Sequence, residues 1–153
     1  VDKNYRTVAK REGRAITGFS SGGHGAQLLG FQHPDLYIAV GSIYSCPDLT
    51  RYAGSRPDWN LPRDLGAYDK HKDTWVKFSI APYVPNLKGK GLAIWIGVGL
   101  NDELLPDNRK LSQQMKELGI EHTYHEAQGG HDGRYGSAGF KECMGFFAKH
   151  LKR

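Results

Sequence analysis

Four apolar runs recur along the chain, and a longer stretch of mixed polarity follows each of them. The runs at 37–45 and 92–100 are almost continuously apolar and rich in β-branched residues, which is typical of strands buried on both faces of a sheet. The run at 15–19 is shorter, and the run at 121–128 has mixed polarity, as expected nearer a sheet edge. The pattern therefore predicts four strands.

Helix signals fill the intervals between these runs. A helix is expected over 21–32, where Pro34 stops it. A second helix is expected to begin near Pro106 and to end at Gly119, with an apolar stripe formed by Leu111, Met115 and Leu118. A last helix over 137–151 is expected to bury Phe140, Cys143, Met144, Phe147 and Leu151.

Strands that alternate with helices in this way predict an α/β fold. We expect about four parallel strands with right-handed crossovers and with helices on both faces of the sheet. The polar segment 1–13 precedes the first strand and is expected to form a short amphipathic helix from Tyr5, Val8 and Ala9.

Residues 46–90 interrupt the alternation with five prolines and six aromatic side chains. We expect short helices and loops here, including one helix near 72–80. Two interpretations stay open for the aromatic residues: they pack over the sheet, or they form a cap that faces a substrate.

Composition limits the function classes. At 153 residues, with 39% hydrophobic and 24% charged residues, the whole chain 1–153 is expected to be one domain with a core of its own. The net charge of +5 is spread along the chain, so nucleic acid is not an expected partner. No apolar run reaches transmembrane length, so a membrane is not an expected partner either. No signal peptide is visible, and the compartment stays open between secreted and cytoplasmic. Cys46 and Cys143 could pair or stay free.

The most informative stretch is Gly18-Phe19-Ser20-Ser21-Gly22, which lies between the first predicted strand and the first predicted helix. A G-x-S-x-G frame in this context is the nucleophile elbow of a serine hydrolase, where glycines are expected on both flanks because the turn is sharp. Ser20 is the candidate nucleophile. The free N–H of Ser21 at the helix start is the candidate oxyanion donor, and His24 is expected to line the site.

A serine hydroxyl needs a base and an orienting acid, and both should follow strands of the same parallel sheet. Asp102 comes directly after the run at 92–100, and His131 comes directly after the run at 121–128. The chain order Ser20, Asp102, His131 is the order of α/β-hydrolases. Glu103 is the fallback acid, Asp107 fits better as a charge at a helix start, and Asp132 is expected to stabilise its loop.

These segments resemble one family. Residues 14–26, 102–109 and 129–132 are similar to the nucleophile, acid and histidine segments of the esterase D-like branch of α/β-hydrolases. That branch includes feruloyl and acetyl-xylan esterases, S-formylglutathione hydrolases, enterochelin esterases and mycolyltransferases. The resemblance implies a serine esterase that needs neither a metal nor another cofactor.

The resemblance also implies several strands before the elbow, with a loop that supplies a second oxyanion donor, and the sequence before Ser20 holds none of them. We therefore expect a partial α/β-hydrolase fold without the early strands, resembling the C-terminal portion of an esterase, with the remainder absent or supplied by a complementing chain or a second copy. The expected substrate is a small or polysaccharide-linked ester, with feruloyl or acetyl esters of plant polysaccharide first. The alternative is a non-catalytic or incomplete esterase fragment that acts as a binding or assembly module.

Overall fold

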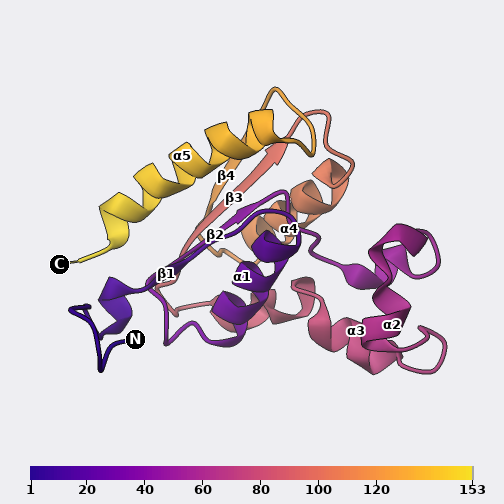
Figure 1. Ribbon diagram of the computed structural model, residues 1–153, viewed down its shortest axis with the longest axis horizontal. Coiled ribbons are helices and arrows are strands. Elements are labelled where there is room, and N and C mark those ends of the chain that lie inside the picture. The colour runs from indigo at the N-terminus through magenta and orange to yellow at the C-terminus, as the bar shows by residue number, and fades with distance from the viewer. Residues whose placement is uncertain (153) are drawn as a thin grey trace.

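The computed structural model describes residues 1–152. A sheet of four parallel strands crosses the molecule in the order β1-β2-β3-β4 (Figure 1). The strands are β1 (Ala15–Ile16), β2 (Ala39–Ile43), β3 (Ala93–Gly99) and β4 (Thr123–Ala127). The predicted strand number and parallel direction are confirmed.

Burial explains why these runs are strands. Every residue of β2 is buried, and so is every residue of β3 after Ala93, as the continuous apolar runs predicted. Strand β4 lies at one edge and is mostly half-buried, which explains its mixed polarity. Strand β1 forms the other edge and is shorter than the predicted 15–19, because only Phe19 pairs again, in an isolated bridge to Ile43.

Helices cover both faces of the sheet (Figure 1). The helix α1 (Ser21–Gln32) and the helix α4 (Leu105–Glu117) contribute to a core on one face, together with the 3₁₀ turns at 81–87. The long helix α5 (Gly133–His150) covers the other face and contributes Tyr135, Cys143 and Phe147 to the second core. The chain ends meet on one side, where the Lys152 N–H donates to the Glu12 carbonyl at 3.0 Å.

The ends of the chain differ from the prediction in two places. Residues 2–4 form a turn, residues 6–9 have no regular structure, and Tyr5 and Val8 are exposed, so the expected amphipathic helix is wrong. Helix α5 begins at Gly133 rather than Ser137, because the Asp132 carboxylate accepts from the N–H groups of Arg134 and Tyr135 and caps it there. Phe140 and Leu151 are exposed, contrary to the predicted burial.

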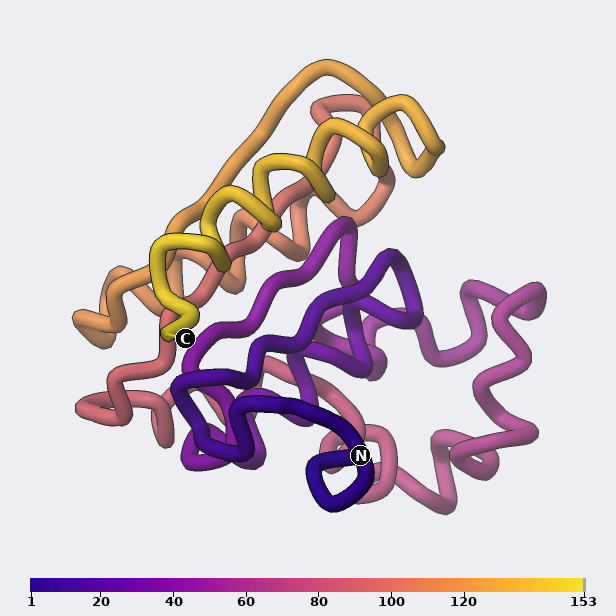
Figure 2. Tube along the Cα trace, turned by 60° about the vertical axis from the view of Figure 1, so that its left-hand side comes forward, coloured from indigo at the N-terminus to yellow at the C-terminus, as the bar shows by residue number. Residues whose placement is uncertain are grey.

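Residues 46–80 stand out to one side of the sheet and hold the short helices α2 (Leu61–Leu65) and α3 (Lys72–Phe78) (Figures 1 and 2). Their aromatic side chains form a small core of their own around the fully buried Trp75. Cys46 and Leu104 join that core, so the segment packs against the start of α4. Cys46 and Cys143 are both buried and unpaired, which settles the pairing left open by the sequence.

Two glycines of α1 offer a matched stability test. A Cβ on Gly30 would collide with the buried Val40 side chain of β2, whereas a Cβ on Gly25 would meet no atom within 4 Å. We expect Gly30→Ala to lower the free energy of unfolding by about 1–3 kcal/mol through overpacking. Gly25→Ala should raise it by about 0.5–1 kcal/mol, since glycine is a poor helix residue. Urea unfolding of both variants measures the difference, and equal shifts would contradict the close helix–sheet contact.

Candidate active site

Ser20 occupies a strained turn between β1 and α1. Its φ of 50° and ψ of −119° are unusual for a residue with a side chain, and such strain is concentrated at functional sites. The turn is fixed on both sides, because the Ser20 N–H donates to the Ile43 carbonyl at 2.9 Å and the Ser20 carbonyl accepts from the His24 N–H at 2.8 Å. Ser20 therefore projects from the start of α1 at the carboxyl edge of the sheet.

Glycine is required at one flank of this turn. The backbone of Gly22 folds so close to Gly18 that a Cβ on Gly18 would overlap it. A Cβ on Gly22 itself would meet no atom within 4 Å, so the expectation that both flanks need glycine is correct for Gly18 only. The contact packs the first turn of α1 against the end of β1.

Asp102 follows β3 and is held rigidly. Its side chain is buried, and its Oδ1 accepts from the Leu104 N–H at 2.8 Å. Its own N–H donates to the Gly99 carbonyl at 3.1 Å, and its carbonyl accepts from the Leu105 N–H at 3.1 Å. The carboxylate is therefore fixed by the turn that leads into α4.

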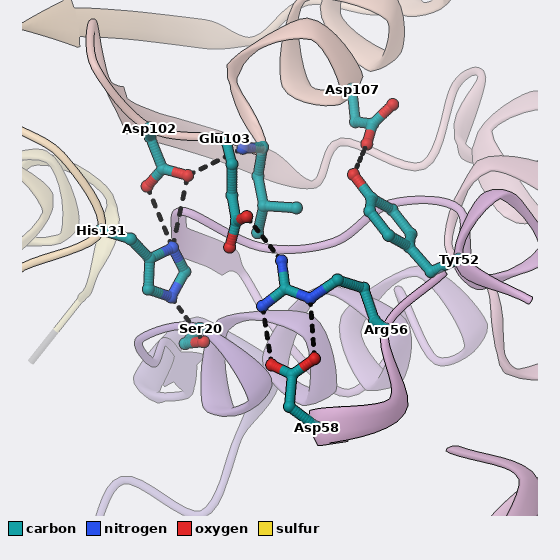
Figure 3. Close-up of polar contacts among 9 residues, drawn as sticks. Ser20, Tyr52, Arg56, Asp58, Asp102, Glu103, Asp107 and His131 are labelled. Atoms are coloured by element: carbon teal, nitrogen blue, oxygen red, sulfur yellow. Dashed lines mark hydrogen bonds and ion pairs between the residues drawn. The ribbon is translucent and has the colours of Figure 1, made fainter. Parts of the chain in front are cut away.

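His131 follows β4 and connects the other two side chains (Figure 3). Its Nδ1 lies 3.0 Å from Asp102 Oδ2 and 3.3 Å from Asp102 Oδ1, and its Nε2 lies 2.8 Å from Ser20 Oγ. Both distances between ring nitrogens and their nearest oxygens are within hydrogen-bond range. The structure thus brings together all three residues that the sequence singled out as nucleophile, base and acid.

The surroundings of His131 favour its protonated form. The hydrogen bond to Asp102 raises the pKa of His131 above its ordinary value, and partial burial opposes this only in part. The side chain is 31% exposed, so protons exchange with solvent. Its ring also lies against Tyr44, with 4.3 Å between the ring centroids.

The predicted oxyanion donor, Ser21, and the predicted lining residue His24 lie next to Ser20. Ser21 opens α1, and within residues 1–152 its N–H has no acceptor, so it is free to donate to a ligand. The ring of His24 is used in the structure, because its Nδ1 lies 2.7 Å from the Cys46 carbonyl and ties α1 to the chain after β2. Burial lowers the pKa of His24 below its ordinary value, and the ring lines a cavity beside Ser20.

The remaining acidic candidates have other partners. Glu103 bonds Arg56 Nη1 at 2.5 Å rather than His131 (Figure 3). Asp107 lies in the first turn of α4, as predicted, but it is buried and paired with Arg51 and the Tyr52 hydroxyl. Asp132 caps α5, in agreement with its predicted role in the loop.

Two neighbours of the site were missed by the sequence reasoning. Tyr44 follows β2 just as Asp102 follows β3, and its φ of 41° marks a strained backbone beside His131. The sequence analysis placed Tyr44 inside the predicted strand 37–45, so the rule that located Asp102 and His131 did not single it out. Arg56 lies near Ser20 and His131 in the projecting segment, and no local pattern in the sequence indicates this (Figure 3).

Within residues 1–152 no three His, Cys, Asp or Glu side chains are grouped as metal ligands. Every helix in the same part of the chain is too short or too polar to span a bilayer.

The chain is similar to known proteins in sequence and in fold. An acetyl esterase of Caldicellulosiruptor saccharolyticus is 28% identical over 134 residues, which are 80% of this chain and 50% of that protein. An esterase of Mycobacterium tuberculosis is 26% identical over 151 residues, covering 86% of this chain and 33% of that protein. The chain thus spans half or less of the length of these relatives.

Among solved structures, a ferulic acid esterase matches with a TM-score of 0.77 and 26% identity over 97% of this chain and 55% of that one. The fluorophosphonate-binding serine hydrolase F of Staphylococcus aureus matches with a TM-score of 0.74 and 16% identity, over 100% of this chain and 60% of that one, which shows the fold alone. The fold is that of the α/β-hydrolases. The family model Esterase, described as "Putative esterase", matches residues 1–144, and this chain belongs to that family.

Proposed function

We propose that this protein hydrolyses carboxylic esters with Ser20 as nucleophile, His131 as base and Asp102 as the orienting acid. The observation that carries the proposal is the continuous relay from Ser20 Oγ through His131, with 2.8 Å on one side of the ring and 3.0 Å on the other. Membership of an esterase family supports it independently.

The geometry supports the following sequence of steps. His131 Nε2 removes the proton of the Ser20 hydroxyl as Oγ attacks the acyl carbon, and Asp102 stabilises the imidazolium that forms. The oxyanion of the tetrahedral intermediate accepts a hydrogen bond from the Ser21 N–H. His131 then gives its proton to the leaving alcohol oxygen, and the acyl group stays on Ser20 Oγ. A water molecule, deprotonated by His131, attacks the acyl-enzyme and releases the acid and Ser20.

Feruloyl or acetyl esters of plant polysaccharide are the first substrates to test. The name acetyl esterase belongs to a relative and the name ferulic acid esterase to a structural neighbour, so both acyl groups are proposals for this chain. No cofactor takes part in the proposed cycle.

Labelling with a fluorophosphonate tests the proposal on the chain as it is. An assembled relay makes Ser20 nucleophilic, so mass spectrometry of the digested protein should find the phosphonyl adduct on the peptide that contains Ser20. Hydrolysis of p-nitrophenyl acetate by the same preparation should accompany the labelling. An unlabelled Ser20 together with no ester turnover would refute the proposal and favour a binding or assembly module.

The pH dependence of turnover follows from His131. The ring acts as a base only when neutral, and the Asp102 hydrogen bond raises its pKa above the ordinary value. We therefore expect kcat/KM to be full at alkaline pH and to fall about tenfold per pH unit below a midpoint that lies above about 6.5. A pH-stat assay from about pH 5 to about pH 9 measures the midpoint. A midpoint below about 6.5 would contradict the Asp102–His131 bond.

A further inference from the structure

An apolar cavity of about 340 Å³ opens directly beside Ser20. Ser20, Ser21 and His24 form one side of it, and the remaining lining residues come from the chain after β2 and from the start of α4: Cys46, Leu49, Trp59, Leu61 and Leu104. The three larger hollows of the surface are lined by none of the site residues. This cavity is therefore the one from which a bound group reaches the nucleophile.

The position of His131 decides which part of an ester the cavity holds. The leaving alcohol oxygen receives its proton from His131 Nε2, so the alcohol must lie on the His131 side of Ser20. His131 does not line the cavity, whereas Ser21, the oxyanion donor, does. The group attached to the acyl carbon thus extends into the cavity, and the alcohol extends away from it.

Trp59 forms a wall of this cavity that other side chains hold in place. It ends the 3₁₀ turn Pro57–Trp59, and its ring lies 4.9 Å from the ring of Tyr52, measured between centroids. The Arg56 guanidinium lies over the Trp59 ring, 4.5 Å from its centroid. A cation over an indole face is attractive, so both neighbours fix the ring.

Arg56 connects this wall to the acid of the relay. Its guanidinium bonds Glu103 at 2.5 Å and both oxygens of Asp58 at 3.1 and 2.9 Å (Figure 3). Glu103 is the neighbour of Asp102 in the chain, and Leu104, which follows, lines the cavity. Trp59, Leu104 and the turn that holds Asp102 are therefore connected through Arg56 and Glu103.

We infer that the cavity selects apolar acyl groups longer than acetyl and that Trp59 determines this specificity. Arg56 positions Trp59 through its bond to Glu103. This inference rests on the proposed ester hydrolysis. A cavity of this size lies at the lower end of those that bind small molecules, and an acetyl methyl would leave most of its apolar lining uncovered.

A series of p-nitrophenyl acetate, butyrate and hexanoate tests the inference, because only the acyl group changes. We expect kcat/KM to rise about fourfold with each methylene that the cavity buries. Trp59→Ala should lower the ratio of kcat/KM for hexanoate to that for acetate about tenfold, which equals the lost contact of between one and two methylenes. Trp59→Phe should restore part of that ratio, and Tyr5→Ala, which removes an exposed aromatic residue, should leave it unchanged.

Arg56→Gln should lower the same ratio by a smaller factor and also move the pH profile. The positive charge of Arg56 lowers the pKa of His131, so its removal should shift the acid midpoint of kcat/KM to higher pH. A role in folding alone would not move this midpoint. An unchanged ratio and an unchanged midpoint would refute the positioning role of Arg56.

The outcomes separate this inference from the proposed function. If Ser20 is labelled and ester turnover does not depend on the length of the acyl group, the cavity assignment is overturned and the esterase proposal stands. If turnover depends on the length of the alcohol while the acyl group is constant, the cavity binds the alcohol rather than the acyl group. If Trp59→Ala lowers kcat/KM by the same factor for all three esters, Trp59 has only a structural role. Absence of both labelling and turnover would instead refute the proposed function itself.

Discussion

Replacing Ser20 with alanine is expected to lower kcat for p-nitrophenyl esters by on the order of 10⁶-fold, the loss seen when the nucleophile of a serine hydrolase relay is removed. The methyl group of alanine cannot form the acyl-enzyme, and His131 Nε2 loses its partner at 2.8 Å. The initial rate of p-nitrophenol release at saturating ester measures the effect.

The control for this variant is Ser137→Ala. Ser137 is an exposed serine of α5, so its replacement should leave both turnover and fluorophosphonate labelling unchanged. Ser20→Ala should also take up no fluorophosphonate, while its circular dichroism spectrum stays that of the unsubstituted protein. A Ser20→Ala rate above about a tenth of the parent rate would mean that another group attacks the ester.

The strands and the three relay residues were predictable because each depends on a local pattern and one general rule of topology. Strands β2 and β3 are buried on both faces, so their apolar runs are unmistakable in sequence. Parallel strands place their following loops at one edge, and this rule alone predicts that Ser20, Asp102 and His131 lie together.

The surroundings of the relay were not predictable in the same way, because they depend on contacts between distant segments. Arg56 and Glu103 are 47 positions apart, and Trp59 lines the cavity only because residues 46–66 fold back against α4. The sequence indicated an aromatic-rich segment at 46–90 that packs over the sheet or forms a cap that faces a substrate, and the cap stays a proposal. Trp75 is buried in a small core beside the sheet, whereas Trp59 faces the cavity.

The prediction of where α5 begins was wrong for a more local reason. The side chain of Asp132 can cap a helix or orient a loop, and the sequence does not say which, so the start of α5 was placed four residues late. Phe140 then turned out exposed, with its ring stacked on Phe19 at 5.6 Å between centroids. A shift of the helix start does not change the face that Cys143 and Phe147 bury.

Asp102→Asn is expected to lower kcat by about 10⁴-fold while the fold is kept. The carboxylate accepts a hydrogen bond from the His131 Nδ1–H, which leaves Nε2 unprotonated and able to accept the Ser20 proton. An asparagine amide can donate to Nδ1 instead, and the ring then carries its proton on Nε2, where it cannot act as a base toward Ser20. Asparagine matches aspartate in shape, so the buried site and its bond from the Leu104 N–H should survive.

Glu103→Gln is the matched comparison, because Glu103 is the adjacent acid and bonds Arg56 rather than His131. We expect it to lower kcat by less than about tenfold, so a loss on the scale of Asp102→Asn would transfer the role of the acid to Glu103. The pH profile gives a second, independent readout. Because the Asp102 hydrogen bond is the largest cause of the raised pKa of His131, the residual activity of Asp102→Asn should have its acid midpoint at lower pH than the parent protein. A midpoint that stays in place would mean that Asp102 does not control the protonation of His131, even if the rate falls as expected.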